Sequence, residues 1–278
     1  MPLIKKILFP VDFSDACFGA ARYVEAFAGR FEAEIMLLHV VGMGEHNLAE
    51  ELLPRRQTQL DSFLVDELKY FTTQRLCVIG DPSSGIVDAA RRWSPDLVMM
   101  PTHGLGVFRR LLLGSVTAKV LHDLDCPVWT GVHSAAAPLL EKIHCRRILC
   151  AVDLTERSRM ILDWASSLAG EYQAVLGIAH ATAELPPAYY GMSLEKEYAQ
   201  SVSEQTKRRV EILQTAAGTA GPVFVNSGDP AEVVACAAKD FDADLVVIGR
   251  HSGKGIAGHL RHNAYAIVRN SPCPVISI

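Results

Sequence analysis

The segment from Gly104 to Ser115 has the residue types that hold an anion such as phosphate. Its glycines let the backbone approach a ligand closely, and Ser115 can cap the helix predicted to follow, whose first N–H groups would face that anion. Arg109 and Arg110 add positive charge nearby, although such a pair is most often part of a solvated helix face. The glycines are Gly104, Gly106 and Gly114.

Asp12 offers a second kind of chemistry, directly after a short apolar run. A carboxylate in this position can accept a hydrogen bond from an exocyclic amine, and it can equally cap the helix predicted to follow. The residues His39, Val40 and Val41 end a second apolar run, where strand main chain could hold the flat edge of a base. Together with the glycine segment, these residues suit a nucleotide.

The hydrophobic pattern predicts a parallel α/β sheet that brings these segments together. Apolar runs bounded by turn residues indicate buried strands, and helical patterns at 16–28 and 83–93 separate them. The alternation favours right-handed βαβ units and a doubly wound open sheet, whose ligands bind beyond the carboxyl ends of the strands. The strands predicted in the first half are Lys6–Val11, Ile35–Val41, Arg75–Ile79, Leu97–Met100 and Val128–Val132.

Capping residues stand at several of the predicted helix starts. Ser14-Asp15 and Thr155-Glu156 offer side-chain oxygens just before helical spacing begins. Pro82 and Pro230 stand where a first helical turn tolerates proline. We therefore expect helices to begin at these points.

The sequence contains an internal repeat that covers most of the chain. The run from Ile7 to Asp12 returns as Ile148 to Asp153 at an offset of 141 residues, and Cys126-Pro127-Val128 returns as Cys273-Pro274-Val275. Repetition on this scale indicates two whole domains, which we place at 1–135 and 143–278 with an Ala-rich linker at 134–142. Extra residues of the second copy fall around 185–193 as a surface excursion. The strands predicted in the second half are Ile148–Val152, Val175–His180, Val223–Asn226, Leu245–Ile248 and Val275–Ile278.

Composition excludes several classes of protein. The 278 residues carry a net charge of −4, which gives no long-range reason to expect nucleic acid as a partner, since nucleic-acid-binding proteins usually have a basic face. No apolar run reaches the length of about 18 residues that a membrane span needs, so we expect no membrane association and a cytoplasmic location. The seven cysteines are scattered and include no CxxC pair, which favours reduced thiols.

The first half resembles the nucleotide-binding members of the universal stress protein family, here in a tandem form. Those members carry G-x2-G-x9-G-S/T, which Gly104 and Gly114-Ser115 match, while Pro101 stands at the first glycine. The resemblance implies two Rossmann-like, adenine nucleotide alpha hydrolase-like domains that bind ATP, AMP or another adenine nucleotide, with Mg²⁺ accompanying it. The residues it implies are Pro10, Asp12 and Val40 for adenine, and Gly104, Gly114, Ser115 and Val116 for phosphate.

The second copy departs from this motif. Gly249 restores the first glycine, but Ser252 replaces the second, and Arg261 and His262 stand opposite Gly114 and Ser115. A bulky arginine where the backbone should turn against phosphate would obstruct the site, or could donate to a different anion. We expect this half to be mainly structural, and we expect Asp153 to have a structural role as well.

The histidines do not form an obvious catalytic or metal site. His39, His103, His180 and His251 follow predicted strands, and we expect them to form hydrogen bonds there rather than act as bases, because no nucleophile recurs beside them. The concentration of His251, His259 and His262 lacks a clear carboxylate or cysteine partner, so we expect no metal site. We assign no catalytic residue, and any slow ATP hydrolysis would be incidental.

Two functions remain open. The favoured one is a stress-response regulator that responds to an adenine nucleotide and acts on an unidentified protein partner. The alternative is a scaffold that no longer binds nucleotide. A nucleotidyl-transfer enzyme is disfavoured, because Val11 to Ser14 matches neither an SGGxDS loop nor a HxGH signature. The resemblance further implies an internal pseudo-dimer formed through 128–132 and 275–278, and is compatible with a homodimer.

Overall fold

The protein divides into two compact units, Met1–His144 and Cys145–Ile278. The computed structural model describes residues 4–42, 49–102, 113–131, 139–184, 195–250 and 259–278. Parts of the predicted linker and the predicted excursion at 185–193 lie outside these residues. Each unit is described by itself below.

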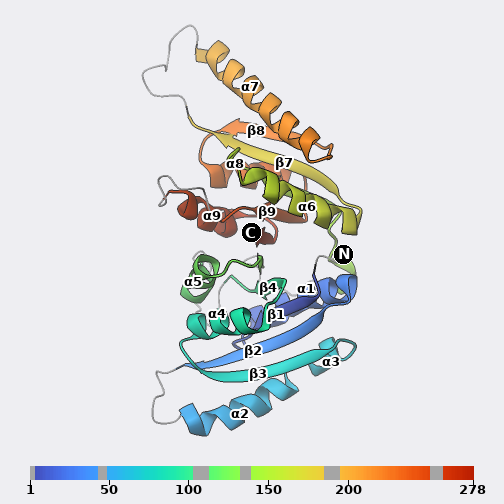
Figure 1. The fold of residues 1–278 in the computed structure, drawn as a ribbon, viewed down its shortest axis with the longest axis vertical. Helices are drawn as coiled ribbons and strands as arrows, with labels where there is room; N and C mark the ends of the chain where they lie inside the picture. Colours follow the sequence, from blue (N-terminus) through green and yellow to red (C-terminus); the bar gives the residue numbers. More distant parts are fainter. Residues whose placement is uncertain (1–3, 43–48, 103–112, 132–138, 185–194, 251–258) are drawn as a thin grey trace. The chain divides into compact units, whose positions relative to one another are not determined.

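The first unit is built on five parallel strands in the order β3-β2-β1-β4-β5 (Figure 1). The strands are β1 (Lys6–Pro10), β2 (Glu34–Gly42), β3 (Thr73–Gly80), β4 (Leu97–Met100) and β5 (Val128–Thr130). The helices between them are α1 (Asp15–Phe31), α2 (Ala49–Ser62), α3 (Val65–Leu68), α4 (Pro82–Trp93) and α5 (Ser115–Asp123), and a short 3-10 turn η2 follows at Leu140–Lys142.

The second unit repeats this architecture in the strand order β10-β9-β6-β7-β8. Its strands are β6 (Arg147–Ala151), β7 (Val175–Thr182), β8 (Val223–Ser227), β9 (Leu245–Ile248) and β10 (Val275–Ser277). Its helices are α6 (Ser158–Tyr172), α7 (Glu195–Ala216), α8 (Pro230–Asp240) and α9 (His259–Asn270). The predicted doubly wound parallel fold is therefore confirmed for both halves.

The two units also share their strand register. Leu8 of β1 pairs with Met36 of β2 and with Val98 of β4. Leu149, its counterpart in β6, pairs with residues 177 and 246 at the matching positions. Leu8 and Leu149 are fully buried, as expected for the middle strand of a sheet whose faces are both covered by helices. The sequence repeat is therefore a repeat of structure, and residues at equal offsets can be compared directly.

Helix starts follow the predictions only in part. Pro82 and Pro230 occupy the first turns of α4 and α8, and the preceding aspartates cap those helices with their side chains. Helix α1 begins directly after Ser14, as predicted, but the Ser14 hydroxyl makes no cap bond to it. The prediction was wrong for Thr155, since α6 begins later, at Ser158. Both hydroxyls donate instead to the aspartate two residues earlier.

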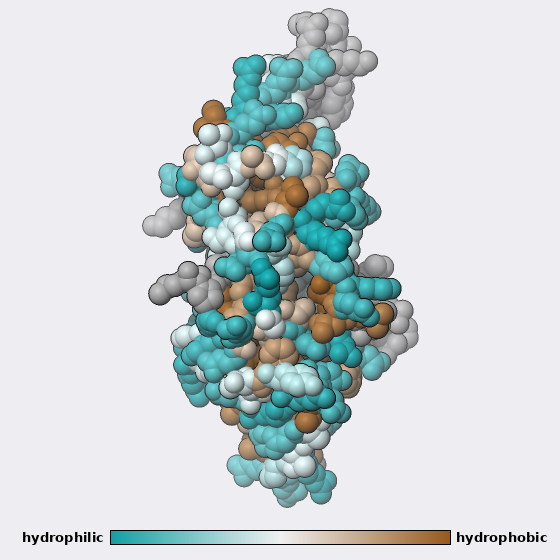
Figure 2. Space-filling model, turned by 90° about the vertical axis from the view of Figure 1, so that its right-hand side faces the viewer, coloured by the Kyte–Doolittle hydropathy of each residue, from teal (hydrophilic) through white to brown (hydrophobic). Residues whose placement is uncertain are grey.

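The surface is mixed in character. The face drawn in Figure 2 is mostly hydrophilic, with hydrophobic residues in separate patches. Large hydrophobic side chains that remain exposed include Tyr70 and Ile212. Within the part of the chain that the structure describes, no helix combines the length and the apolar character needed to cross a membrane.

Candidate functional site

Asp12 follows β1 and organises the turn into α1. One carboxylate oxygen, Oδ1, accepts the backbone N–H of Ser14 at 3.0 Å, the Ser14 hydroxyl, and the Cys17 thiol at 3.1 Å. Burial, reinforced by the charge of Asp12, raises the pKa of Cys17 to about 12, so this thiol stays protonated and can donate. No described residue donates to the second oxygen, Oδ2. The expected capping of α1 by Asp12 is not observed, because its carboxylate binds Ser14, the N-cap residue itself, and the Cys17 thiol rather than a helix N–H. This turn uses one oxygen and leaves the other for a ligand.

Asp153 builds the same turn in the second unit. Its Oδ1 accepts the N–H and the hydroxyl of Thr155, at 3.0 and 2.7 Å, and the hydroxyl of Ser158 at 2.9 Å. Partial burial of this otherwise exposed residue acts to raise the pKa of Asp153, but the hydrogen bonds from Thr155 and Ser158 outweigh it and hold the pKa below its usual value. The carboxylate is therefore ionised at neutral pH.

A histidine fixes the end of the second strand in each unit. Nδ1 of His39 donates to the backbone oxygen of Val11 at 2.8 Å, and Nδ1 of His180 donates to that of Val152 at 2.8 Å. The prediction that these two histidines form strand-end hydrogen bonds is confirmed. Burial lowers the pKa of His39, which keeps its ring neutral at neutral pH. His103 and His251 lie outside the described residues.

Val40 places main-chain groups just beyond the end of β1. Val11 donates its N–H to the carbonyl of Leu38 at 2.8 Å, and this is the last backbone bond on that side of β2 among the described residues. Alternate residues of a strand direct their peptide groups to the same neighbour. The N–H and C=O of Val40 therefore face the space past β1, where a flat ligand edge could pair with them.

Val40 packs closely against the backbone of α4 at Gly85. A Cβ atom at Gly85 would lie 2.9 Å from Cγ2 and 3.1 Å from Cγ1 of Val40, closer than carbon atoms normally approach. The absence of a side chain at Gly85 is what lets the helix pack against the end of β2.

The start of α5 supplies N–H groups after β4 that bond to no described residue. Gly114 is the N-cap, with φ −60° and ψ 143°, and its N–H donates to the carbonyl of Thr102 at 2.8 Å. Its own carbonyl accepts the N–H of Ala118 at 2.8 Å. The N–H groups of residues 115–117 precede this first helical bond and lie at the positive end of the helix dipole. This is the arrangement that favours an anion.

Most of the predicted site residues thus lie at the carboxyl edge of the first sheet. Pro10 ends β1, Asp12 follows it, Val40 lies near the end of the neighbouring β2, and α5 begins after β4 on the other side of β1. Pro101 also lies at this edge, where its carbonyl accepts the Thr117 hydroxyl at 3.2 Å. Outside the described residues lie Gly104, Gly106, Arg109 and Arg110.

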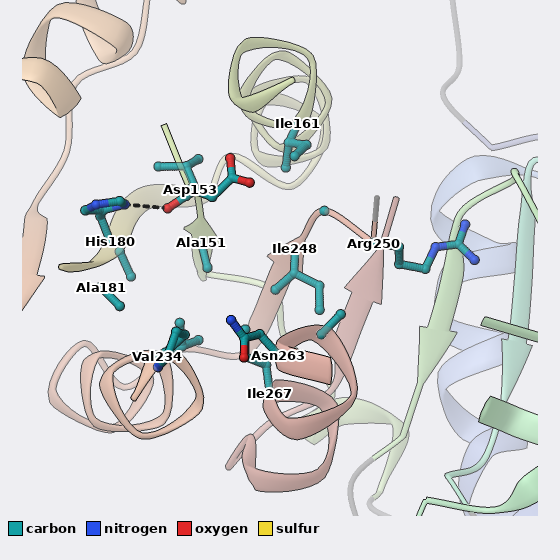
Figure 3. A pocket seen from close by; sticks show the side chains of 15 residues that line it. Ala151, Asp153, Ile161, His180, Ala181, Val234, Ile248, Arg250, Asn263 and Ile267 are labelled. Atoms are coloured by element: carbon teal, nitrogen blue, oxygen red, sulfur yellow. Dashed lines mark hydrogen bonds between the residues drawn. The ribbon is translucent and has the colours of Figure 1, made fainter. Parts of the chain in front are cut away.

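The second unit contains a cavity of about 180 Å³ at the corresponding edge (Figure 3). It lies beyond the carboxyl ends of β6, β7 and β9 and between α6, α8 and α9. Apolar side chains such as Ile161, Val234 and Ile248 line it, and Asp153, His180 and Asn263 add polar groups. The second half was expected to be mainly structural, so a cavity here was not foreseen.

Two exchanges of side-chain size distinguish the units around this edge. Where the first unit has Val40 against Gly85, the second has the smaller Ala181 in the strand and Val233 in the helix. Gly249 stands at the position of Pro101, and a Cβ atom there would collide with Cδ1 of Ile161. The first unit has an alanine, residue 20, at the position of Ile161.

Helix α9 also differs from α5. It begins at His259, whereas the residue opposite Ser115 is His262. The position of Val116 is taken by Asn263, whose side chain points into the cavity (Figure 3). The side chains of Arg261 and His262 lie outside the described part of the chain.

Sequence reasoning missed several of these residues. Cys17 and Ser158 each complete the hydrogen bonds to the aspartate, and the shared spacing Asp-x-Ser/Thr-x-x-Cys/Ser in both halves was the signal for them. Phe13 and Leu154 follow the aspartates in the left-handed region, with φ of 63° and 58°. Neither is glycine, so nothing in the sequence indicated this strained conformation.

Comparison with known proteins gives one consistent result. The model of Usp, the universal stress protein family, matches residues 3–130 and again residues 144–278. Universal stress protein A homolog 1 of Coxiella burnetii is 29% identical over 140 residues, covering 49% of this chain and 97% of that protein. Universal stress protein MJ0531 of Methanocaldococcus jannaschii is 33% identical over 140 residues, covering 45% of this chain and 81% of that protein.

A solved structure matches both halves together. The crystal structure of a universal stress protein from Archaeoglobus fulgidus has a TM-score of 0.73 at 20% identity, and the match covers 98% of this chain and 95% of that one. At this identity the similarity shows a shared fold and carries no further argument about ligands.

Proposed function

The chain belongs to the universal stress protein family, with one family unit in each half, and from this premise we propose that its first unit binds an adenine nucleotide. ATP is the favoured ligand, and AMP or another adenine nucleotide would use the same groups. Occupancy would regulate the affinity of this stress protein for a protein partner.

The observation that carries the proposal is the meeting of three kinds of group at one edge of the first sheet. Asp12 keeps Oδ2 for an amine, since its turn uses Oδ1. Val40 offers main-chain N–H and C=O groups to the edge of a base. The first turn of α5 offers N–H groups to phosphate. Each part of an adenine nucleotide therefore has a matching group on a different segment.

The residues fit the ligand class in detail. Pro10 would contact the base beside Asp12 and Val40, while Gly114, Ser115 and Val116 would hold phosphate, together with Gly104. Mg²⁺ would be held chiefly by the phosphates, because no group of three ligating side chains occurs among the described residues. Pro101 removes one N–H donor from this edge, which would weaken phosphate binding without closing the site.

We propose binding rather than catalysis as the activity. Cys17 is the thiol nearest to Asp12, and its raised pKa makes it a poor nucleophile. His39 uses Nδ1 to bind Val11, and its position is set by the strand end. A nucleotide held by these groups would thus be sensed rather than turned over.

Titration calorimetry of the full chain with ATP tests the proposal. ATP should also raise the unfolding temperature, since a ligand at a hundred times its Kd stabilises the native state by about 2.7 kcal/mol. Gly114→Arg introduces the residue of the second half, and the φ of −60° at this position suits any residue. This variant should fold and lose ATP binding.

Gly170→Arg is the matched control. It adds the same side chain to α6, where a Cβ atom would meet nothing within 4 Å, and it should bind ATP like the parent chain. No heat and no thermal shift at millimolar ATP would reject the proposal and favour the scaffold. Unchanged affinity in Gly114→Arg would show that the phosphates lie elsewhere.

A further inference from the structure

The cavity of the second unit is large enough for one six-membered ring, and its walls are apolar. Its volume is about 180 Å³, and isoleucine and valine side chains from α6, α8, β9 and α9 form the walls. An apolar cavity of roughly 150 Å³ accommodates a benzene ring. The small side chains of Ala151 and Ala181 leave the space open, where the first unit has the larger Pro10 and Val40.

The polar groups of the cavity favour a ligand that donates hydrogen bonds. Asp153 lies at the mouth, ionised, with Oδ1 used by its turn and with no described residue bonded to Oδ2. Arg250 contributes to the lining, but Figure 3 shows its guanidinium directed away from the space between Asp153 and Asn263. Asp153 and Arg250 are the two charged residues among the described residues that line the cavity, and only Asp153 faces its interior.

The backbone of α9 argues against phosphate in this cavity. In the first unit, Val116 is the second residue of α5, so its N–H is free for an anion. Its counterpart Asn263 is the fifth residue of α9, and helix geometry assigns its N–H to the carbonyl of His259. The free N–H groups of α9 precede this position, and the Asn263 amide projects into the cavity instead.

We propose that this cavity is a second, separate binding site, for a single-ring compound that carries an amine or amidine and no phosphate. The ring lies between Ile161, Val234 and Ile248. Its donor group binds Oδ2 of Asp153, and the Asn263 amide gives a further hydrogen bond to the ring substituent. The two halves of the chain then bind different ligands.

The test uses the full chain with benzamidine and benzoate as probes, in ligand-observed saturation-transfer NMR and calorimetry. The two probes share a ring and differ in the sign of charge at its substituent. Benzamidine should bind more tightly than benzoate by at least about threefold, a modest ratio because Asp153 is exposed. Millimolar ATP should not displace benzamidine.

Two variants separate the parts of the site. Ala181→Leu fills the cavity and should weaken benzamidine binding by about tenfold or more, the loss expected when an apolar ring is excluded. Asp153→Asn keeps one oxygen to accept from Thr155 and Ser158, so the turn is preserved, but it replaces the ligand's acceptor with a donor. This variant should remove the preference for benzamidine over benzoate.

The outcomes are decisive in either direction. Equal binding of the two probes, unchanged binding by folded Ala181→Leu, competition by ATP, or no binding of benzamidine would each overturn the proposal. Gly114→Arg should leave benzamidine binding intact, so failure of the nucleotide site in the first unit and failure of this site are distinguishable.

Discussion

Replacing Gly85 with alanine should destabilise the first unit, although alanine is the better helix former. The new Cβ would lie 2.9 Å and 3.1 Å from the two γ-methyl groups of Val40. These methyls occupy two of the three staggered positions about the Val40 Cα–Cβ bond, so any other rotamer leaves at least one of them in place. The collision must therefore move either the strand end or the helix.

The magnitude follows from two opposing terms. Exchanging glycine for alanine inside a helix stabilises it by about 0.8–1.0 kcal/mol. Overpacking a fitted contact costs roughly 1–3 kcal/mol. The net expectation for Gly85→Ala is a loss of up to about 2 kcal/mol in the free energy of unfolding. The new methyl group should also displace Val40, and ATP affinity should fall because Val40 is expected to contact the base.

A double-mutant cycle in urea measures the contact. Val40→Ala introduces the alanine that the second unit has at this position, and combining it with Gly85→Ala should remove the collision. The coupling between the two substitutions should be roughly 0.5–3 kcal/mol, in the sense that the double variant is more stable than additivity predicts.

Gly19→Ala is the control for helix propensity. Gly19 lies within α1, and a Cβ atom there would meet nothing within 4 Å, so this variant should be as stable as the parent chain or more so. If Gly85→Ala also stabilised the protein, or if the cycle were additive, the packing argument for Val40 would be refuted.

Two further predictions concern titration and reactivity. The depressed pKa of Asp153 means that its turn stabilises the fold above the ordinary carboxylate pKa of about 3.9, and that this contribution is lost as pH falls through the lower folded value. For so exposed a group, the parent chain and Asp153→Asn should differ by less than about 1 kcal/mol in the free energy of unfolding. Urea titrations should show this difference shrink between neutral pH and pH about 3. A difference that grew as the pH fell would contradict the assignment. Burial raises the pKa of Cys17 and of Cys150 to about 12, whereas Cys236 is exposed, so iodoacetamide should modify Cys236 first in time-resolved mass spectrometry. Early labelling of Cys17 would refute this.

The sheet could be predicted because its physical signal is local. Each predicted strand overlaps an observed one. The inner strands are buried on both faces and so form continuous apolar runs, whereas β3 and β8 at the sheet edges are partly exposed. Helices α2 and α7 were expected only from the alternation of strands and helices and were not located individually, because their mean hydropathy is low and their apolar stripe is weak. Matching register in both units explains why the repeat also aligned the site residues.

The site was less predictable, because its properties arise from contacts between distant segments. The first-half residues were located by motif, and Asp12 and Val40 do lie on neighbouring segments. Contacts such as Gly85 against Val40 join residues far apart in sequence, and no spacing rule reveals them. The cavity of the second unit depends on Ala181 of β7 and Asn263 of α9, which line the same space although they are far apart in sequence, whereas the motif directed attention to the substitutions in its loop.

Hydrogen–deuterium exchange of the full chain, with and without ATP, tests the central claim most directly. ATP should slow exchange in peptides that contain Asp12, Val40 and the first turn of α5, and should leave the corresponding peptides of β6, β7 and α9 unchanged. Protection confined to the second unit, or no protection in either unit at saturating ATP, would contradict the account.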